Sequence, residues 1–178
     1  MLNPSAPPEK ERQYAKLELE RRFLLTRVPG EAVRRAHLHD RYVHGTRLRL
    51  RRQEGDDGSV VFKLSQKVPR PDGRPGLITT MYLDEAEYRA LEGLPADALR
   101  KVRLSVPPFA VDLFARPLSG LVIGEVEFAT EAERDAWAPP PDAVLREITG
   151  DGRLTCAALA GADAGRIAHA LAAAGVTA

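Results

Sequence analysis

Several features that would narrow a protein's class are scarce in this chain of 178 residues. Its single cysteine, Cys156, excludes an internal disulfide and a cluster of thiolate metal ligands, and it favours a reducing compartment. Its net charge is close to zero, with 26 Lys and Arg against 25 Asp and Glu, which excludes a polybasic tail protein and an acidic disordered protein. Aromatic residues make up only 6% of the chain, which argues against nucleic-acid binding by base stacking.

Long apolar runs are missing as well. No stretch approaches the roughly 18–20 apolar residues of a membrane span, and the N-terminal residues contain no apolar segment of a secretory signal. We therefore expect a cytoplasmic protein that does not associate with membranes. Hydrophobic residues make up 44% of the chain, which is enough for a core. We expect residues 1–15 to form a flexible lead and residues 16–178 to form a single domain that includes a C-terminal helix.

Apolar and polar residues alternate along most of the chain, and this period of two predicts the strands of a mainly β, α+β fold. The glycines and aspartates of residues 55–58 predict a hairpin turn between two such strands. Asp84 and Thr130 are expected to be the N-caps of two short helices. The alternation is interrupted at residues 31–37, where we expect a short helical turn, with the next strand beginning at Arg41.

The charged face of each predicted strand carries mostly one sign. The members are two acidic pairs, Glu18 with Glu20 and Glu125 with Glu127, and three basic sets, Arg47 with Arg49 and Arg51, Lys63 with Lys67, and Lys101 with Arg103. Taken alone, each strand could be the solvated face of an antiparallel sheet. Like charges two residues apart repel, however, and a closed sheet would turn such faces inward, where unpaired charges are costly.

A pair of ligands would satisfy both sets of charges at once. Carboxylate pairs suit a hard divalent cation such as Mg²⁺ or Mn²⁺. A row of Arg and Lys side chains suits a highly charged, oxygen-rich anion such as polyphosphate or a nucleoside triphosphate. The chain has no glycine-rich phosphate loop of the Walker type, so side chains would have to hold the phosphates.

The segment Glu18-Leu19-Glu20-Arg21-Arg22 resembles the Glu-x-Glu-x-Lys signature of the CYTH domain, also called the triphosphate tunnel metalloenzyme family. The resemblance continues in order over roughly residues 16–160, through Arg49 and Arg51, residues 63–67, Lys101 and Arg103, and residues 111–114, 124–128 and 147–151. It implies an eight-stranded antiparallel β-barrel tunnel with flanking helices. It also implies Mg²⁺ or Mn²⁺ as cofactor and a triphosphate compound as substrate.

The resemblance also implies a role for each residue of the charged sets. The metal ligands would be Glu18, Glu20, Asp112, Glu125 and Glu127. The substrate would be bound by Arg47, Arg49, Arg51, Lys101, Arg103 and one of Lys63 and Lys67, with Lys67 preferred.

Arg22 and Tyr42 would be the catalytic pair. Arg22 stands where the signature has a lysine, and arginine is a poor proton acceptor. Residues 77–83 carry no charge, whereas relatives carry Arg and Glu on the matching strand. The level of activity therefore stays open.

We expect a divalent-metal-dependent hydrolase of triphosphate compounds, with inorganic tripolyphosphate as the first candidate substrate. Two alternatives stay open. One is a thiamine triphosphatase or a class IV-type adenylate cyclase, and the other is a non-catalytic module that binds triphosphate or polyphosphate. The partner is expected to be a small molecule rather than a nucleic acid or a membrane, and a homodimer is left open.

Overall fold

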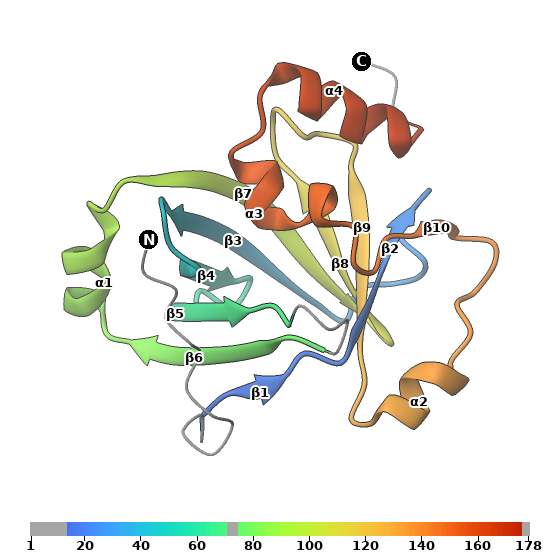
Figure 1. Ribbon diagram of the computed structural model, residues 1–178, viewed down its shortest axis with the longest axis horizontal. Helices are drawn as coiled ribbons and strands as arrows, with labels where there is room; N and C mark the ends of the chain where they lie inside the picture. The colour runs from blue at the N-terminus through green and yellow to red at the C-terminus, as the bar shows by residue number, and fades with distance from the viewer. Residues whose placement is uncertain (1–13, 71–74, 176–178) are drawn as a thin grey trace.

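One antiparallel sheet of ten strands dominates the computed structural model, which describes residues 14–70 and 75–175 (Figure 1). The strands lie in the order β1-β6-β5-β4-β3-β7-β8-β9-β2-β10. Their bounds are β1 (Lys16–Leu17), β2 (Glu20–Leu25), β3 (Arg34–Val43), β4 (Leu48–Gly55), β5 (Val60–Val68), β6 (Leu77–Leu83), β7 (Ala96–Val106), β8 (Phe109–Phe114), β9 (Val122–Glu127) and β10 (Val144–Glu147). Most of the expected flexible lead, residues 1–13, lies outside the described residues.

Short helices surround the sheet. They are α1 (Glu85–Glu92), α2 (Glu131–Ala136), α3 (Cys156–Ala160) and α4 (Ala164–Ala173), with a 3₁₀ helix (Gly152–Leu154) before α3. Asp84 and Thr130 cap α1 and α2 as expected, each accepting a hydrogen bond from the backbone three residues on. None of the helices within the described residues is long and apolar enough to cross a membrane.

The expectation of a closed, eight-stranded barrel is wrong, because the sheet has ten strands and does not close. The reason lies in the stretch from Lys16 to Leu25. Its first two residues pair with β6, whereas residues 20–24 pair with β9 near the other end of the sheet. Between them, the Glu18 N–H donates to the Gly76 carbonyl and the Leu19 carbonyl accepts from the Phe128 N–H. One stretch of chain therefore forms two separate strands and contacts both ends of a curved sheet.

The helical turn expected at residues 31–37 is also wrong. Residues 34–43 form the ten-residue strand β3, which pairs with β4 on one side and β7 on the other. Both faces of this strand carry polar residues, so its alternation is weak in the sequence. Ala36, Leu38 and Asp40 are nevertheless buried on one face.

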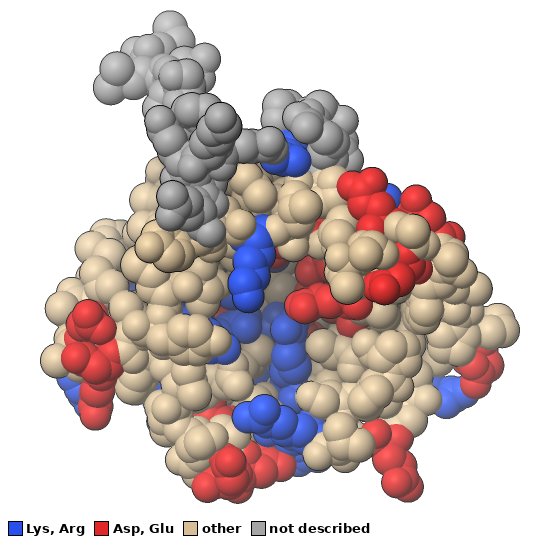
Figure 2. Space-filling model, turned by 90° about the horizontal axis from the view of Figure 1, so that it is seen from below, with Lys and Arg blue, Asp and Glu red and all other residues tan. Residues whose placement is uncertain are grey.

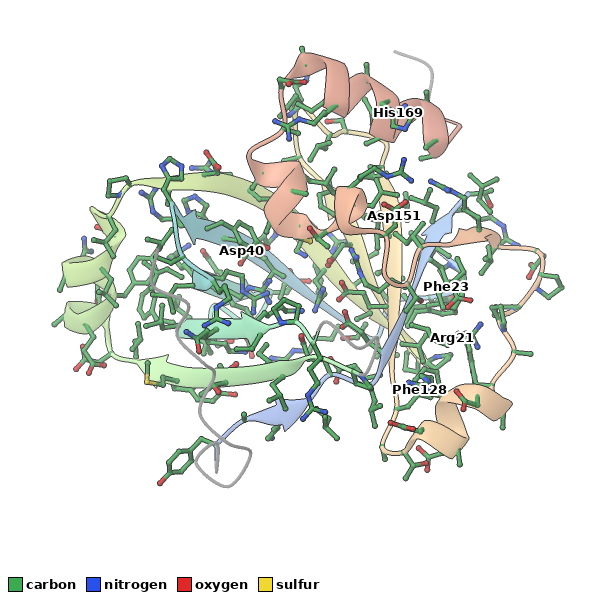
Figure 3. All side chains as sticks on the ribbon, in the orientation of Figure 1. Arg21, Phe23, Asp40, Phe128, Asp151 and His169 are labelled. Carbon is green, nitrogen blue, oxygen red and sulfur yellow. The ribbon has the colours of Figure 1, made fainter. Side chains whose placement is uncertain are left out.

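Two hydrophobic clusters hold the fold together, one on each face of the sheet. The first lies where α3 and α4 cover the sheet, and Leu24, Ile123, Leu154 and Leu171 belong to it. The second lies on the opposite face, where the ring of Trp137 packs against Phe23 and Phe109. Arg21 lies over this second cluster, with its guanidinium carbon 5.3 Å from the centre of the Phe23 ring (Figure 3). The first cluster fills one end of the inner, concave face, so the rest of that face is available for polar side chains.

Candidate active site

Nearly all the predicted site residues lie on the concave face of the sheet. Residues that pair directly across two strands share a face, and the register pairs members of the charged sets with one another. The pairs are Glu20 with Glu127, Arg22 with Glu125, Arg103 with Asp112, and Arg51 with Lys63. Figure 2 shows a hollow in the molecule with basic side chains in its depth and acidic side chains along one rim. The predicted sharing of one face by acids and bases is therefore present in the fold.

The acidic side of the site is built from β2 and β9. Burial raises the pKa of the Glu20 carboxyl above its ordinary value, and the nearby charges of Glu125 and Glu18 raise it further. The opposite holds for Glu125, because the charges of Arg103, Lys101 and Arg22 outweigh its burial and lower its pKa. Glu127, the direct cross-strand neighbour of Glu20, is exposed.

Several carboxylates of this group are already engaged by cations. The Lys67 ammonium lies 2.6 Å from Glu18 Oε1, and the Arg103 guanidinium lies 2.5 Å from Glu125 Oε2. In the parts of the chain that the structure describes, no three Asp, Glu, His or Cys side chains are placed as a ready metal cluster. Carboxylate oxygens are nevertheless the donors that a hard cation prefers. A cation at Glu20 would also offset the repulsion from Glu125 and Glu18 that raises its pKa.

Asp112 occupies a different position from the four glutamates. It is completely buried, and both of its oxygens accept hydrogen bonds from Arg103 at 2.7 Å. Lys101 Nζ donates to Asp112 Oδ2 at 2.5 Å and to Cys156 Sγ at 3.2 Å. Asp112 therefore holds two of the predicted substrate-binding cations in place.

The basic side of the site carries more positive charge than its acids neutralise. Burial and the charges of Arg51, Arg49 and Arg103 lower the pKa of the Lys63 ammonium. Lys63 donates to Gln53 Oε1 at 3.3 Å and lies over the Tyr82 ring, but no carboxylate pairs with it among residues 14–70 and 75–175. Arg49 Nε is buried and finds no acceptor among the described residues. A cluster of cations with an unsatisfied buried donor is the arrangement that an anionic ligand would complete.

The two predicted catalytic residues are both partly or fully buried. Arg22 is buried, donates to the Leu154 carbonyl at 2.9 Å and lies 3.4 Å from Glu125 Oε1. Tyr42 packs against the cluster under α3, and burial, followed by the charges of Cys156 and Asp40, raises the pKa of its hydroxyl well above the ordinary value. No hydrogen bond joins Tyr42 to Arg22 in the described part of the chain. Arg47 is exposed and precedes β4.

The sequence analysis missed Asp40, which lies on β3 directly opposite Arg51. It also missed Ser65, whose hydroxyl lies 3.4 Å from Arg49 Nη2 and 3.0 Å from the Thr80 hydroxyl. The alternation of Ala36, Leu38, Asp40 and Tyr42 was the available signal for Asp40, since it places an acid on the same face as apolar residues.

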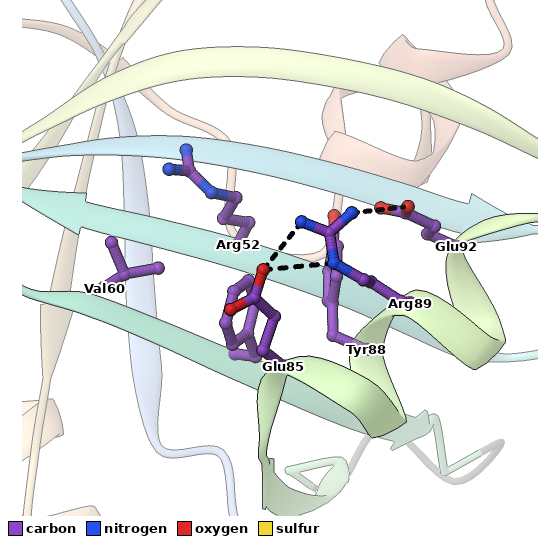
Figure 4. Close-up of a pocket in the computed structure, with 7 residues that line it drawn as sticks. Arg52, Val60, Glu85, Tyr88, Arg89 and Glu92 are labelled. Atoms are coloured by element: carbon purple, nitrogen blue, oxygen red, sulfur yellow. Dashed lines mark hydrogen bonds and ion pairs between the residues drawn. The ribbon is translucent and has the colours of Figure 1, made fainter.

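A second hollow lies on the outer face of the sheet, beneath α1 (Figure 4). It measures about 290 Å³ and is lined by Arg52, Val60, Phe62, Glu85, Tyr88, Arg89 and Glu92. Arg89 pairs with both Glu85 and Glu92 in its wall. The charges that line this outer hollow are thus balanced locally, in contrast to those on the basic side of the concave face.

Comparisons with known proteins place the chain among its relatives. No family model matches the sequence. The chain is 32% identical to the inorganic triphosphatase of Nitrosomonas europaea over 152 residues, which cover 80% of this chain and 96% of that protein. A crystal structure of the inorganic triphosphatase NE1496 matches with a TM-score of 0.53 and 26% identity, covering 82% of this chain and 99% of that one. A second crystal structure of NE1496, described as a hypothetical protein, matches with a TM-score of 0.52 and 28% identity, covering 80% of this chain and 97% of that one. On the length and identity of the first match, the chain belongs to the family of the Nitrosomonas europaea inorganic triphosphatase.

Proposed function

We propose that this protein is a CYTH-type hydrolase that cleaves inorganic triphosphate in the cytoplasm with the help of Mg²⁺ or Mn²⁺. The observation that carries the proposal is the cluster of Arg49, Arg51, Lys63 and Arg103, which has an excess of positive charge and a buried Arg49 donor that finds no acceptor among the described residues. The relative's activity on inorganic triphosphate supports the same substrate.

The chain's own residues suit the cleavage of a terminal phosphate. Arg49, Arg51 and Lys63 would bind non-bridging oxygens of the phosphate chain, and Arg103 would stabilise charge as it moves to the leaving group. A water oxygen would form the new bond to the terminal phosphorus while the bond to the bridging oxygen breaks, releasing diphosphate and phosphate. Arg22 would position charge without accepting the proton of the water, because its guanidinium stays protonated.

The cation would be held by Glu20, Glu125 and Glu127, with Glu18 beside them. Its binding would relieve the repulsion that raises the pKa of Glu20. When bound, such a cation neutralises phosphate oxygens and lowers the pKa of a coordinated water.

Lys63 rather than Lys67 is the proposed phosphate ligand of β5. Lys67 is engaged by Glu18, whereas Lys63 lies beside Arg51 and Arg49. We expect Lys63→Met to weaken tripolyphosphate binding about 10- to 100-fold, the usual loss for one charge-assisted hydrogen bond. Lys67→Met should change it less than about threefold, because an exposed ion pair contributes little. Isothermal titration calorimetry in EDTA measures both, and equal losses would contradict the assignment.

The same titration has a pH dependence. The charged ammonium is the form that binds phosphate. The affinity for tripolyphosphate is therefore highest below the pKa of Lys63 and falls as the pH rises through that pKa. Because that pKa is lowered, the weakening should begin at a lower pH than for an ordinary lysine. It should be absent in Lys63→Met.

Arg22→Lys tests whether water activation limits the rate. We expect faster phosphate release, because the amine of a lysine can release and accept a proton, whereas the guanidinium of arginine stays protonated. The rate should rise further with pH until the new lysine is neutral. An unchanged or lower rate would mean that Arg22 already acts by its position between Glu125 and the Leu154 carbonyl.

Phosphate release from tripolyphosphate, ATP and thiamine triphosphate, each with Mg²⁺ and with Mn²⁺, tests the function itself. We expect tripolyphosphate to give the highest rate. A second candidate, a non-catalytic triphosphate-binding module, is favoured by the missing hydrogen bond between Tyr42 and Arg22 in the described structure. Tight binding of tripolyphosphate without release from any substrate would establish it and exclude the hydrolase.

A further inference from the structure

Asp40 is a buried charge at the centre of the basic side of the concave face. It has no exposed surface, and it lies on β3 opposite Arg51 on β4. Arg51 Nε donates to Asp40 Oδ1 at 2.5 Å, and Arg51 Nη2 donates to Oδ2 at 2.7 Å. Figure 3 shows Asp40 inside the curve of the sheet. Since both oxygens are taken and the residue is covered, Asp40 has no surface with which to contact a ligand.

The surroundings of Asp40 keep it ionised. Burial alone would raise the pKa of its carboxyl, but the hydrogen bonds and charge of Arg51, together with the charges of Arg49 and Lys101, lower it. Arg49 and Arg51, two of the proposed phosphate-binding cations, therefore lie in the field of one fixed anion, as does Lys101. Without that anion, the repulsion between Arg49 and Arg51 would be uncompensated until a ligand arrived.

The two hydrogen bonds also fix the direction of the Arg51 guanidinium. A guanidinium has five N–H donors in a rigid plane, and two of them are used by Asp40. The Nη1 donors and the second Nη2 donor are left for a ligand. A bidentate pair thus sets the plane in which the remaining donors point.

We propose that Asp40 is a positioning residue that acts through Arg51, orienting its free donors toward the phosphate that is transferred. The proposal rests on the proposed function for its kinetic part. Because Asp40 carries negative charge, it opposes binding of an anion in the ground state while improving the geometry of Arg51. Removing the charge of Asp40 should therefore lower kcat without raising KM. A variant that simply unfolds would not show this combination.

Asp40→Asn is the first variant. We expect kcat for tripolyphosphate to fall about 10- to 100-fold, the usual loss when a group is misplaced by about 1 Å. KM should stay the same or fall, because a negative charge has been removed from an anion site. Asp142→Asn is the matched control, since Asp142 pairs with Arg27 on the surface, and it should leave both constants unchanged. A raised KM with unchanged kcat would overturn the proposal.

A double-mutant cycle asks whether Asp40 acts through Arg51. Lysine cannot form the two-pronged contact, so Arg51→Lys should lose kcat as well. If Asp40 works only by orienting Arg51, adding Asp40→Asn to Arg51→Lys should cost less than about twofold more. Independent losses that multiply would refute the positioning role.

The Arg51 Nε–H signal in a ¹H–¹⁵N spectrum tests the geometry without any turnover. We expect a sharp, slowly exchanging signal in the wild-type protein, absent in Arg51→Lys and broadened or shifted to the solvent-exposed position in Asp40→Asn. An unchanged signal in Asp40→Asn would overturn the proposal even if the protein has no triphosphatase activity, and a lost signal would support it in the same case. If Asp40→Asn does not fold, Asp40→Glu is the second variant, because it keeps the charge but displaces the Arg51 guanidinium. We expect Asp40→Glu to change the Arg51 Nε–H signal and to lower kcat as described for Asp40→Asn.

Discussion

Replacing Glu20 with Gln is expected to lower metal-dependent phosphate release from tripolyphosphate about a thousandfold, since a lost metal contact removes several kcal/mol of transition-state stabilisation. Glutamine keeps the size of the side chain but removes the charge that a divalent cation needs. Glu20 is the informative choice among the acids, because it lies close to both Glu18 and Glu125 and forms no ion pair with the described residues. Its carboxylate is therefore free to bind a cation.

The measurement is phosphate release over a range of Mn²⁺ concentrations, combined with Mn²⁺ binding followed by electron paramagnetic resonance. Glu131→Gln, on the exposed first turn of α2, is the matched control and should behave as the wild type. The same substitution makes a second prediction. A folded-state pKa that is raised means that the charged carboxylate destabilises the fold at neutral pH, so Glu20→Gln should raise Tm in EDTA. Wild-type turnover and Mn²⁺ affinity in Glu20→Gln would exclude a metal site at this position.

Replacing Asp112 with Asn is expected to cost about 3–5 kcal/mol of the free energy of unfolding, the usual loss when one partner of a buried ion pair is removed. For a chain of this size that corresponds to a Tm lowered by roughly 6–20 °C. The physical reason is that Asp112 is the common partner of Lys101 and Arg103. Lys101 has almost no exposed surface, so its charge would be left buried without the carboxylate that pairs with it.

Thermal and urea unfolding in EDTA measure this loss, with Asp135→Asn as the control for a surface ion pair, where a change under about 1 kcal/mol is expected. The experiment also separates two roles for Asp112. A metal ligand would shift the Mn²⁺ dissociation constant as Glu20→Gln does, whereas an anchor for cations would leave it nearly unchanged. A stable Asp112→Asn variant with weakened Mn²⁺ binding would restore the metal role.

The sequence predicted the strands and their polar face because both follow from a period of two. Arg49 and Arg51 must share a face with each other wherever the strand lies, and so must Glu125 and Glu127. The same rule could not decide between Lys63 and Lys67, since four residues apart also means the same face. The proposed choice of Lys63 depends on neighbours that are distant in sequence, namely Glu18 beside Lys67 and residues of β4 and β7 near Lys63.

The errors have a similar origin. Strand β3 was misread because polar side chains lie on both of its faces, and Asp40 is hidden among them as a buried charge. Burial of an acid depends on a partner such as Arg51, which local alternation does not reveal. The closed barrel was expected from the family resemblance, and the alternation of residues 16–25 was read as one strand. Their division into β1 and β2 depends on hydrogen bonds to residues near Gly76 and Phe128.

The divided stretch from Lys16 to Leu25 has a consequence for how the chain acquires its structure. This stretch is synthesised well before its partners in β6, β9 and β10, and the Arg22 N–H donates to the hydroxyl of Thr149, 127 positions further along. Pairings between such distant segments make folding slow, because a long loop must close before any contact compensates for its lost entropy. The free edges of β6 and β9 stay open to other chains until that moment. Folding of this sheet is therefore completed only after synthesis has passed residue 147. The chain is most prone to aggregate in the interval before β1 and β2 pair with β6, β9 and β10.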